Sequence, residues 1–193
     1  MESKKDLKII FLDRDGVINE CPGVGEYVLN EGQFKLHSFA RDSIKKLKDN
    51  GFLVYVISNQ ACVAKKLCTE QEALAVMQKM LREIETDGER LIDGIHFCTH
   101  HSEDSCYCRK PNPGMIFEVF KRLEIEAKEL EYKPYFIGDT IRDVETAHNA
   151  GIRSILVFTG REKPQNNKSW SHKPDMVATD LAEAVDLILK ENQ

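Results

Sequence analysis

Residues 9–16 read Ile9-Ile10-Phe11-Leu12-Asp13-Arg14-Asp15-Gly16, and this stretch decides how the rest of the chain is interpreted. Its first four residues are all apolar, which is typical of a strand buried on both faces of a parallel sheet. Two carboxylates and a glycine follow at once, at the edge where open α/β sheets bind ligands. Carboxylates this close repel each other unless a cation or a shared proton lies between them. Asp13 and Asp15 therefore indicate a metal site, or else a loop whose aspartates only cap nearby backbone N–H groups.

Apolar runs and amphipathic segments alternate along the rest of the chain. The pattern predicts further strands at residues 52–57, 94–98, 135–138, 154–157 and 176–177. It predicts helices at residues 38–50, 69–84, 113–123, 142–151 and 181–189, and a polar loop over 159–174. Thr69 and Glu72 have capping-box spacing, and the helix that they open places Leu74, Met77, Leu81 and Ile84 on one face. This alternation implies an α/β fold with a mostly parallel sheet and helices on both faces.

The composition is that of an ordinary globular protein. The 193 residues are 41% hydrophobic and 31% charged, which fits one domain over residues 1–193. The formal net charge of −5 gives the surface little attraction for nucleic acid or anionic membranes, so any phosphate must bind at a local site. No apolar stretch approaches the ~20 residues of a membrane span. Residues 1–6 contain no apolar signal region, so we expect a cytoplasmic protein.

Four of the predicted strands end in polar residues that can carry chemistry. These are, in chain order, Asp13 and Asp15, Ser58 and Asn59, a Cys/His cluster leading into Arg109 and Lys110, and Asp139. If the strands are adjacent and parallel, these side chains converge on one crevice, which is the default position for an active site. The alternative is that each is only the polar start of a loop.

Asp139 directly follows a predicted strand, and Asp143 stands four residues further on. Asp139 can share a hard cation with Asp13, and Mg²⁺ is the natural choice because it prefers a few carboxylates together with water and phosphate oxygens. We expect Asp143 to support the metal ligands or to act as an acidic residue at a helix N-terminus.

The segment from Cys98 to Cys108 contains three of the six cysteines beside two adjacent histidines. Cys98, Cys106 and Cys108, with His100 or His101, make a Cys₃His set that suits a closed tetrahedral zinc site. The alternative is a group of unrelated free thiols and imidazoles, since a chain without a secretion signal is not expected to build a disulfide framework. A zinc ion would hold the loop that delivers Arg109 and Lys110.

Taken together, these motifs resemble the haloacid dehalogenase (HAD) phosphatase superfamily. Within it, the chain is most similar to the heptose bisphosphate phosphatases and the related histidinol phosphatases. The resemblance is carried by residues 13–19 (DRDGVIN), 58–60 (SNQ), 98–101 (CTHH), 106–115 (CYCRKPNPGM) and 138–143 (GDTIRD), and it extends from about residue 8 to about residue 189. It implies a Rossmann-like HAD fold with a minimal cap and a zinc-binding loop. The family pattern favours His100 over His101 as the zinc ligand.

The resemblance also implies roles for single residues. Asp13 is expected to attack phosphorus and form an aspartyl-phosphate, and Asp15 to serve as acid and then base. The Mg²⁺ ligands are expected to be Asp13, the backbone carbonyl of Asp15, and Asp139. Ser58 and Lys110 are expected to bind the phosphate oxygens. The remaining predicted substrate-binding residues are Asn59, Gln60, Arg109 and Thr140.

The chain departs from the family pattern around the site. Residues 61–66 read ACVAKK where the family usually has SGIARG, the loop over 21–27 is longer than usual, and Thr140 replaces a common Lys or Arg. These changes lie where the substrate beyond its phosphate is expected. The leading interpretation is a monomeric, Mg²⁺-dependent phosphatase of a small phosphorylated metabolite, heptose 1,7-bisphosphate first and histidinol phosphate second. A DNA 3′-phosphatase suits the acidic chain less well. A non-catalytic zinc-loop binding protein is the alternative from another class.

Overall fold

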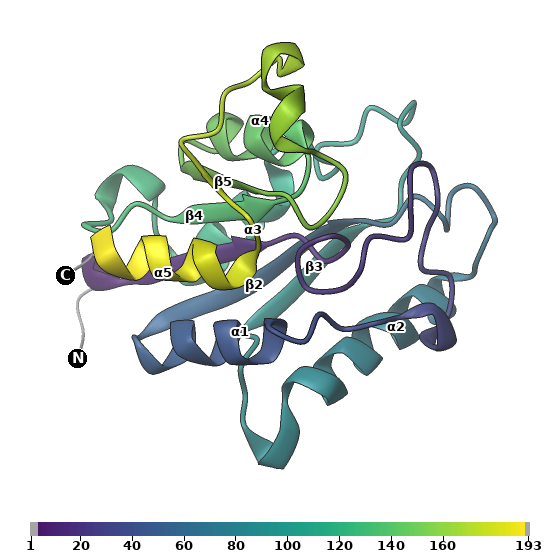
Figure 1. Cartoon of the computed structure of the whole chain (residues 1–193), viewed down its shortest axis with the longest axis horizontal. Coiled ribbons are helices and arrows are strands. Elements are labelled where there is room, and N and C mark those ends of the chain that lie inside the picture. Colours follow the sequence, from purple (N-terminus) through teal and green to yellow (C-terminus); the bar gives the residue numbers. More distant parts are fainter. Residues whose placement is uncertain (1–3, 192–193) are drawn as a thin grey trace.

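A parallel sheet of six strands forms the centre of the protein, seen in a computed structural model that describes residues 4–191 (Figure 1). The strands are β1 (Lys8–Leu12), β2 (Phe52–Asn59), β3 (Gly94–Cys98), β4 (Tyr135–Gly138), β5 (Arg153–Val157) and β6 (Met176–Ala178). Their order in the sheet is β3-β2-β1-β4-β5-β6, and every neighbouring pair is parallel, as predicted. The first three residues of the charged N-terminal stretch and the last two of the predicted domain lie outside the described part.

Within residues 4–191, five α-helices and five 3₁₀ turns precede, connect or follow these strands. The α-helices are α1 (Ala40–Asp49), α2 (Glu70–Ile84), α3 (Gly114–Leu123), α4 (Ile141–Asn149) and α5 (Leu181–Glu191). The 3₁₀ turns are η1 (Lys4–Asp6), η2 (Glu31–Gln33), η3 (Thr86–Gly88), η4 (Ala127–Glu129) and η5 (Pro164–Ser169). Within residues 4–191, the connections β1–α1 and β3–α3 contain no strand or α-helix, in keeping with a minimal cap. No helix in that range is both long and apolar enough to cross a bilayer.

Most predicted boundaries agree with the structure to within two residues. β2 is longer than predicted because Ser58 and Asn59 continue its pairing with β3, opposite Phe97 and Cys98. The predicted polar loop over 159–174 contains the single turn η5. Of the face predicted for α2, Met77 and Ile84 are buried and Leu81 packs partly against the core, whereas Leu74 is 45% exposed. The buried face instead runs through Ala73, Val76, Met77, Met80 and Ile84.

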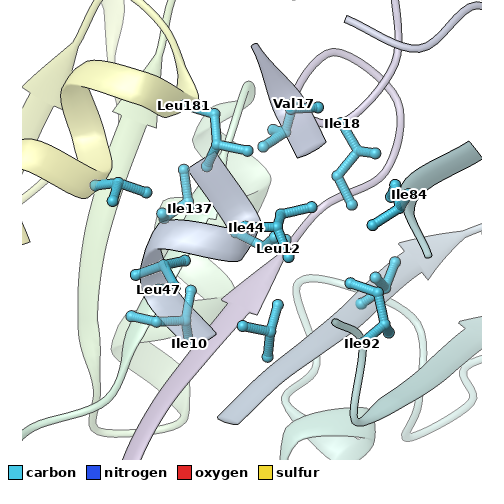
Figure 2. Packing of buried hydrophobic residues seen from close by; sticks show 14 of the residues in the cluster. Ile10, Leu12, Val17, Ile18, Ile44, Leu47, Ile84, Ile92, Ile137 and Leu181 are labelled. Atoms are coloured by element: carbon cyan, nitrogen blue, oxygen red, sulfur yellow. The ribbon is translucent and has the colours of Figure 1, made fainter. Parts of the chain in front are cut away.

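The sheet is covered on both faces, and β1 shows why its whole sequence is apolar. Ile10 and Leu12 pack into a cluster with α1, α2 and α5, where Figure 2 shows Ile44 and Leu47 of α1 beside them. The alternate residues, Ile9 and Phe11, pack into a second cluster with α3 and α4. Side chains of a strand point alternately to opposite faces, so a strand buried on both sides must be apolar at every position.

The strand order creates the crevice. From β1 the chain moves outward to β2 and β3, then returns to place β4 on the other side of β1. The loops that follow β1 and β4 therefore leave the sheet in opposite directions, and ligands bind at such a switch point. The backbone N–H of Asp13 donates to the carbonyl of Ile137 (3.0 Å), which holds the end of β1 against β4.

Candidate active site

A pocket of about 80 Å³ lies at the carboxyl ends of the central strands. Eight residues predicted from the sequence line it: Asp13, Asp15, Ser58, Asn59, Arg109, Lys110, Asp139 and Thr140. Six others complete the lining: Pro22, Glu26, Tyr27, Arg142, Asp143 and Arg161. Gln60 is the one predicted substrate-binding residue that does not reach the pocket, because its side chain is fully buried behind the wall.

Three buried carboxylates form the floor of this pocket. One oxygen each of Asp13, Asp139 and Asp143 lie within 4.8 Å of one another. Burial and the neighbouring carboxylates raise the pKa of Asp139 to about 8. Burial likewise raises the pKa of Asp13 to about 6, although Lys110 opposes the shift. Clustered oxygen ligands that are costly to ionise without a counter-charge fit a hard divalent cation such as Mg²⁺.

Asp143 takes a more direct part in the carboxylate cluster than the sequence indicated. Its side chain is 1% exposed. One carboxylate oxygen accepts hydrogen bonds from the backbone N–H (3.1 Å) and hydroxyl (2.6 Å) of Thr140, forming a capping box at the start of α4. The other oxygen lies 2.7 Å from the Lys110 ammonium group. Asp143 is therefore both the predicted helix N-terminal acid and a member of the carboxylate cluster.

Lys110 holds the positive charge inside the cluster. Its Nζ lies 2.8 Å from Asp13 Oδ2 and donates to the carbonyl of Ile57 (3.2 Å). Burial disfavours the charged amine, but Asp13 and Asp143 outweigh that cost and raise the pKa of Lys110. A permanently charged ammonium beside Asp13 is well placed for a phosphate oxygen.

Asp15 is held by a separate network beside the floor. Its carboxylate accepts hydrogen bonds from the Arg14 guanidinium (2.7, 2.8 and 3.1 Å), from Asn19 Nδ2 (3.0 Å) and from Gln60 Nε2 (3.1 Å). Burial works in the opposite direction, yet Arg14 and these donors lower the pKa of Asp15. Arg14 itself is fully buried, so Asp15 is its counter-charge. The Asp15 carboxylate is not part of the three-carboxylate cluster.

The end of β2 supports the site through three consecutive residues. Ser58 lines the pocket, and its hydroxyl accepts a hydrogen bond from Gln60 Nε2 (2.9 Å). Asn59 exchanges two hydrogen bonds with the backbone of Lys110, accepting at 3.0 Å and donating at 3.1 Å. Gln60 and Asn59 therefore position Asp15, Ser58 and Lys110.

The Cys/His cluster converges as predicted, with His100 as its imidazole. Cys108 Sγ lies 3.3 Å from His100 Nδ1, 3.4 Å from Cys98 Sγ and 3.5 Å from Cys106 Sγ, and Cys98 and Cys106 are 3.6 Å apart. Zinc–sulfur bonds of about 2.3 Å in a tetrahedron require edges of about 3.8 Å, slightly shorter where nitrogen replaces sulfur. The four ligand atoms thus fit one zinc ion. His101 points elsewhere, with its Nδ1 3.9 Å from Glu103.

Arginines that the sequence analysis did not single out also line the pocket. Arg142 lies in the first turn of α4, and Arg161 follows β5, where its backbone N–H donates to Asp139 Oδ2 (2.8 Å). Their signal in the sequence was weak, because an arginine in a polar segment is ordinarily a solvated surface residue. Tyr27 lies within the predicted substrate loop, and Lys65 Nζ stacks 5.2 Å from the centre of its ring. Lys65 therefore packs against the pocket wall.

Comparisons with known proteins agree with this geometry. A family model described as HAD-hydrolase-like matches residues 107–184. The chain is 33% identical to the D-glycero-beta-D-manno-heptose-1,7-bisphosphate 7-phosphatase of Neisseria meningitidis, over 96% of this chain and 97% of that protein. It is 33% identical to a Chlorobaculum tepidum D-glycero-D-manno-heptose-1,7-bisphosphate 7-phosphatase, over 92% of each. A crystal structure of D,D-heptose 1,7-bisphosphate phosphatase from B. bronchiseptica, complexed with magnesium and phosphate, superposes with a TM-score of 0.84 at 29% identity, covering 96% of this chain and 99% of that one.

Proposed function

Since this chain belongs to the heptose-1,7-bisphosphate 7-phosphatase family of HAD-like hydrolases, we propose that it removes the 7-phosphate of D-glycero-D-manno-heptose 1,7-bisphosphate. One observation carries the proposal: Asp13, Ser58 and Lys110, from three separate segments, line one pocket. A nucleophile, a hydroxyl and a fixed ammonium group around a metal-binding cluster suit phosphoryl transfer. Histidinol phosphate is the alternative substrate.

The first step transfers the phosphoryl group to the protein. A carboxylate oxygen of Asp13 attacks phosphorus, the bond from phosphorus to the sugar oxygen breaks, and the leaving oxygen takes a proton from Asp15. The Lys110 ammonium and the Ser58 hydroxyl bind the phosphoryl oxygens while negative charge shifts among them. Asp13 is held for attack because one oxygen accepts from the Arg14 backbone N–H (2.7 Å) and the other lies against Lys110.

The second step releases phosphate and restores Asp13. Asp15 takes a proton from a water molecule, the water oxygen attacks phosphorus, and the bond to Asp13 breaks. The low pKa of Asp15 leaves it ionised, which is the form required of a base. To serve as the acid in the first step it must gain a proton while Arg14, Asn19 and Gln60 remain around it.

The carboxylates of Asp13, Asp139 and Asp143 would hold Mg²⁺, together with the Asp15 backbone carbonyl that the family resemblance implies. When bound, Mg²⁺ offsets the like charges of Asp13 and the substrate phosphate. The chain fits this role because it keeps three carboxylate oxygens together in a buried site. Asp143 then stays tied to Thr140 and Lys110, which fixes its orientation.

Phosphate release tests the function directly. With Mg²⁺ present, we expect turnover of heptose 1,7-bisphosphate to exceed that of histidinol phosphate, fructose 1,6-bisphosphate and a 3′-phosphorylated oligonucleotide. Asp13→Asn should reduce turnover to background, whereas the exposed surface variant Asp49→Asn should behave as the wild type. If no phosphate is released from any of these phosphoesters, the proposed phosphatase function is wrong. Normal turnover by Asp13→Asn would rule out the proposed covalent step. Preference for histidinol phosphate would favour the alternative substrate.

We also propose that Cys98, His100, Cys106 and Cys108 bind a structural zinc ion. The loop between β3 and α3 is polar, and a metal ion would fix it where apolar packing is sparse. Elemental analysis should give about one zinc per chain in the wild type and in Cys68→Ser, and much less in Cys106→Ser. An ordered, zinc-free wild-type protein would contradict this assignment.

A further inference from the structure

A cavity of about 610 Å³ lies away from the active site, on the face of the sheet that α3 and α4 cover. It shares no lining residue with the active-site pocket. The first turn of α4 carries Arg142 and Asp143 into the pocket, whereas Ala150 and Gly151, which follow its last turn, line the cavity. The helix between them is roughly 13 Å long, so a ligand in the cavity would not touch the reacting groups.

The inner surface of this cavity is apolar. Its floor includes Phe120, Ile125 and Ala150, which are at most 9% exposed and belong to the core cluster beneath α3 and α4. Phe117 stands at the edge, one helical turn before Lys121, and is 48% exposed. Pockets for small ligands commonly measure about 300–1,000 Å³ and are lined mainly by apolar and aromatic side chains. The cavity therefore has the size and the lining of a small-molecule site.

Lysines surround this apolar floor, although the chain as a whole has a formal net charge of −5. The cavity is lined by Lys121, Lys128 and Lys133 and by a single carboxylate, that of Glu126. Lys128 Nζ lies 2.7 Å from the Glu126 carboxylate. Within the described residues, the ammonium groups of Lys121 and Lys133 have no ionic or hydrogen-bonding partner. An anionic group at the rim would find two uncommitted cations.

The two helices that end at the cavity reduce this positive charge without cancelling it. The C-terminal ends of α3 and α4 each carry about half a negative charge. Lys121 lies in the last turn of α3 and offsets the dipole of that helix, while Lys133 lies outside any helix. About one positive charge therefore remains at the rim, and it favours an anion over a neutral or cationic ligand.

The surroundings of the cavity suit a small molecule better than a protein partner. Of the large apolar side chains exposed in the described part of the chain, only Phe117 lines the cavity. The others, on different segments, are Val24, Leu67, Leu74, Tyr107 and Val177. A stable protein interface buries about 800 Å² on each partner around an apolar centre. One exposed ring beside a concave floor does not supply such a surface.

We propose that this cavity binds a small amphipathic anion, meaning a molecule with an apolar body and one carboxylate or sulfonate group. The apolar body lies on Phe120 and Ile125, against the ring of Phe117. The anionic group lies at the rim, where it is attracted by Lys121 and Lys133. This site is separate from the proposed phosphatase reaction and does not depend on it.

Fluorescence titration of the full-length, Mg²⁺-loaded protein with anilinonaphthalene sulfonate tests the site. We expect one probe molecule to bind per chain, and octanoate to displace it about 10-fold better than octanol, which lacks the charge. The double variant Lys121→Ala/Lys133→Ala should bind the probe about 10-fold more weakly. The matched control Lys168→Ala/Lys173→Ala removes the same charge from exposed positions elsewhere and should bind as the wild type.

A second pair of variants tests the apolar part of the site. Phe117→Asp removes the aromatic wall and adds a negative charge, so probe binding should fall about 10-fold or more. Leu74→Asp is the matched control, because Leu74 is 45% exposed on a different helix. Circular dichroism shows whether the variants fold. The inference is overturned if the wild type binds no probe, if octanoate and octanol displace it equally, or if either Phe117→Asp or the Lys121/Lys133 variant binds it as the wild type does.

Discussion

Lys110 illustrates how single residues decide this site. Its ammonium group lies within 2.8 Å of carboxylate oxygens of both Asp13 and Asp143, while its side chain is 3% exposed. An ammonium group with such partners is stable only because each charge compensates the others. The same residue therefore contributes to stability in the free protein and to phosphate binding in the proposed reaction.

Replacing Lys110 should destabilise the metal-free protein. In Lys110→Met, Asp13 and Asp143 lose their cation while they stay buried, which should cost about 3–5 kcal/mol of unfolding free energy. Chemical denaturation without Mg²⁺ measures the change. Lys128→Met, at an exposed position, should shift stability little. A loss no larger than that of Lys128→Met would show that the Lys110 pairing contributes little.

The absence of a side chain at Gly160, beside Asp139, should be needed for tight Mg²⁺ binding. A Cβ at Gly160 would overlap the Asp139 carboxylate, so Gly160→Ala must displace that side chain. We expect Mg²⁺ affinity to fall about 10-fold or more, since ligand orientation controls metal binding. Isothermal titration with Mg²⁺ measures this. Gly32→Ala is the matched control, because a Cβ there meets only a side-chain oxygen at 3.3 Å. Equal affinities in the two variants would rule out the packing argument.

At the scale of elements, two capping boxes start helices with different tasks. At α2, Thr69 Oγ1 accepts from the Glu72 backbone N–H (3.2 Å), and Glu72 accepts from the Thr69 backbone N–H (2.7 Å). At α4, Thr140 and Asp143 make the same motif, but there the acid also contacts Lys110. The α2 box is exposed and serves the helix alone, whereas the α4 box also orients the active site.

The α2 box allows helix capping to be tested without touching the site. Thr69→Ala removes the hydroxyl acceptor and should cost about 1 kcal/mol of unfolding free energy. Thr69→Ser keeps the hydroxyl and should retain most of the stability. Thermal or urea unfolding compares the two variants, and phosphatase activity of both should match the wild type. Equal stability of the Ala and Ser variants would argue against a contribution from the cap.

At the scale of the whole molecule, the fold gathers carboxylates from the loops after β1 and β4 into one buried site. In the metal-free protein, the carboxyl groups of that site hold protons that they would release in the unfolded chain. The folded pKa values of Asp13 and Asp139, about 6 and about 8, lie above the ordinary value of 3.8. Between pH 4 and 8 these two carboxyl groups therefore bind more protons in the folded state than in the unfolded state, and their contribution to stability falls as the pH rises.

Mg²⁺ should reverse this trend, because it binds the ionised carboxylates. The increase in melting temperature caused by Mg²⁺ should be larger at pH 8 than at pH 6, and binding at pH 6–7 should release protons. Calorimetry in buffers of different ionisation enthalpy measures that release. Asp139→Asn should flatten the pH dependence. A Mg²⁺ effect independent of pH in the wild type would contradict the assigned ligands.

Much of the site was predictable because its residues follow strands. Asp13 and Asp139 could be located from apolar runs that end in carboxylates, and parallel strands bring such ends together. The Cys/His spacing similarly predicted the cluster, since its four ligands lie within one short segment. Arg142 and Arg161 could not be selected this way, because an arginine in a polar segment carries no sign of what it faces. Gln60 was misjudged because its motif neighbours do line the pocket.

The sequence by itself determined the strand-and-helix alternation, the parallel sheet, the convergence of polar strand ends and the soft-ligand set of the Cys/His loop. These follow from local hydrophobic patterning and from ligand types at short spacing. Only the tertiary structure decided that Asp143 joins the buried carboxylates, that Arg14 is buried against Asp15, and that Arg142 and Arg161 line the pocket. Each of these features depends on which side chains from distant segments contact one another, and on whether their charges compensate there. The local sequence does not determine those contacts.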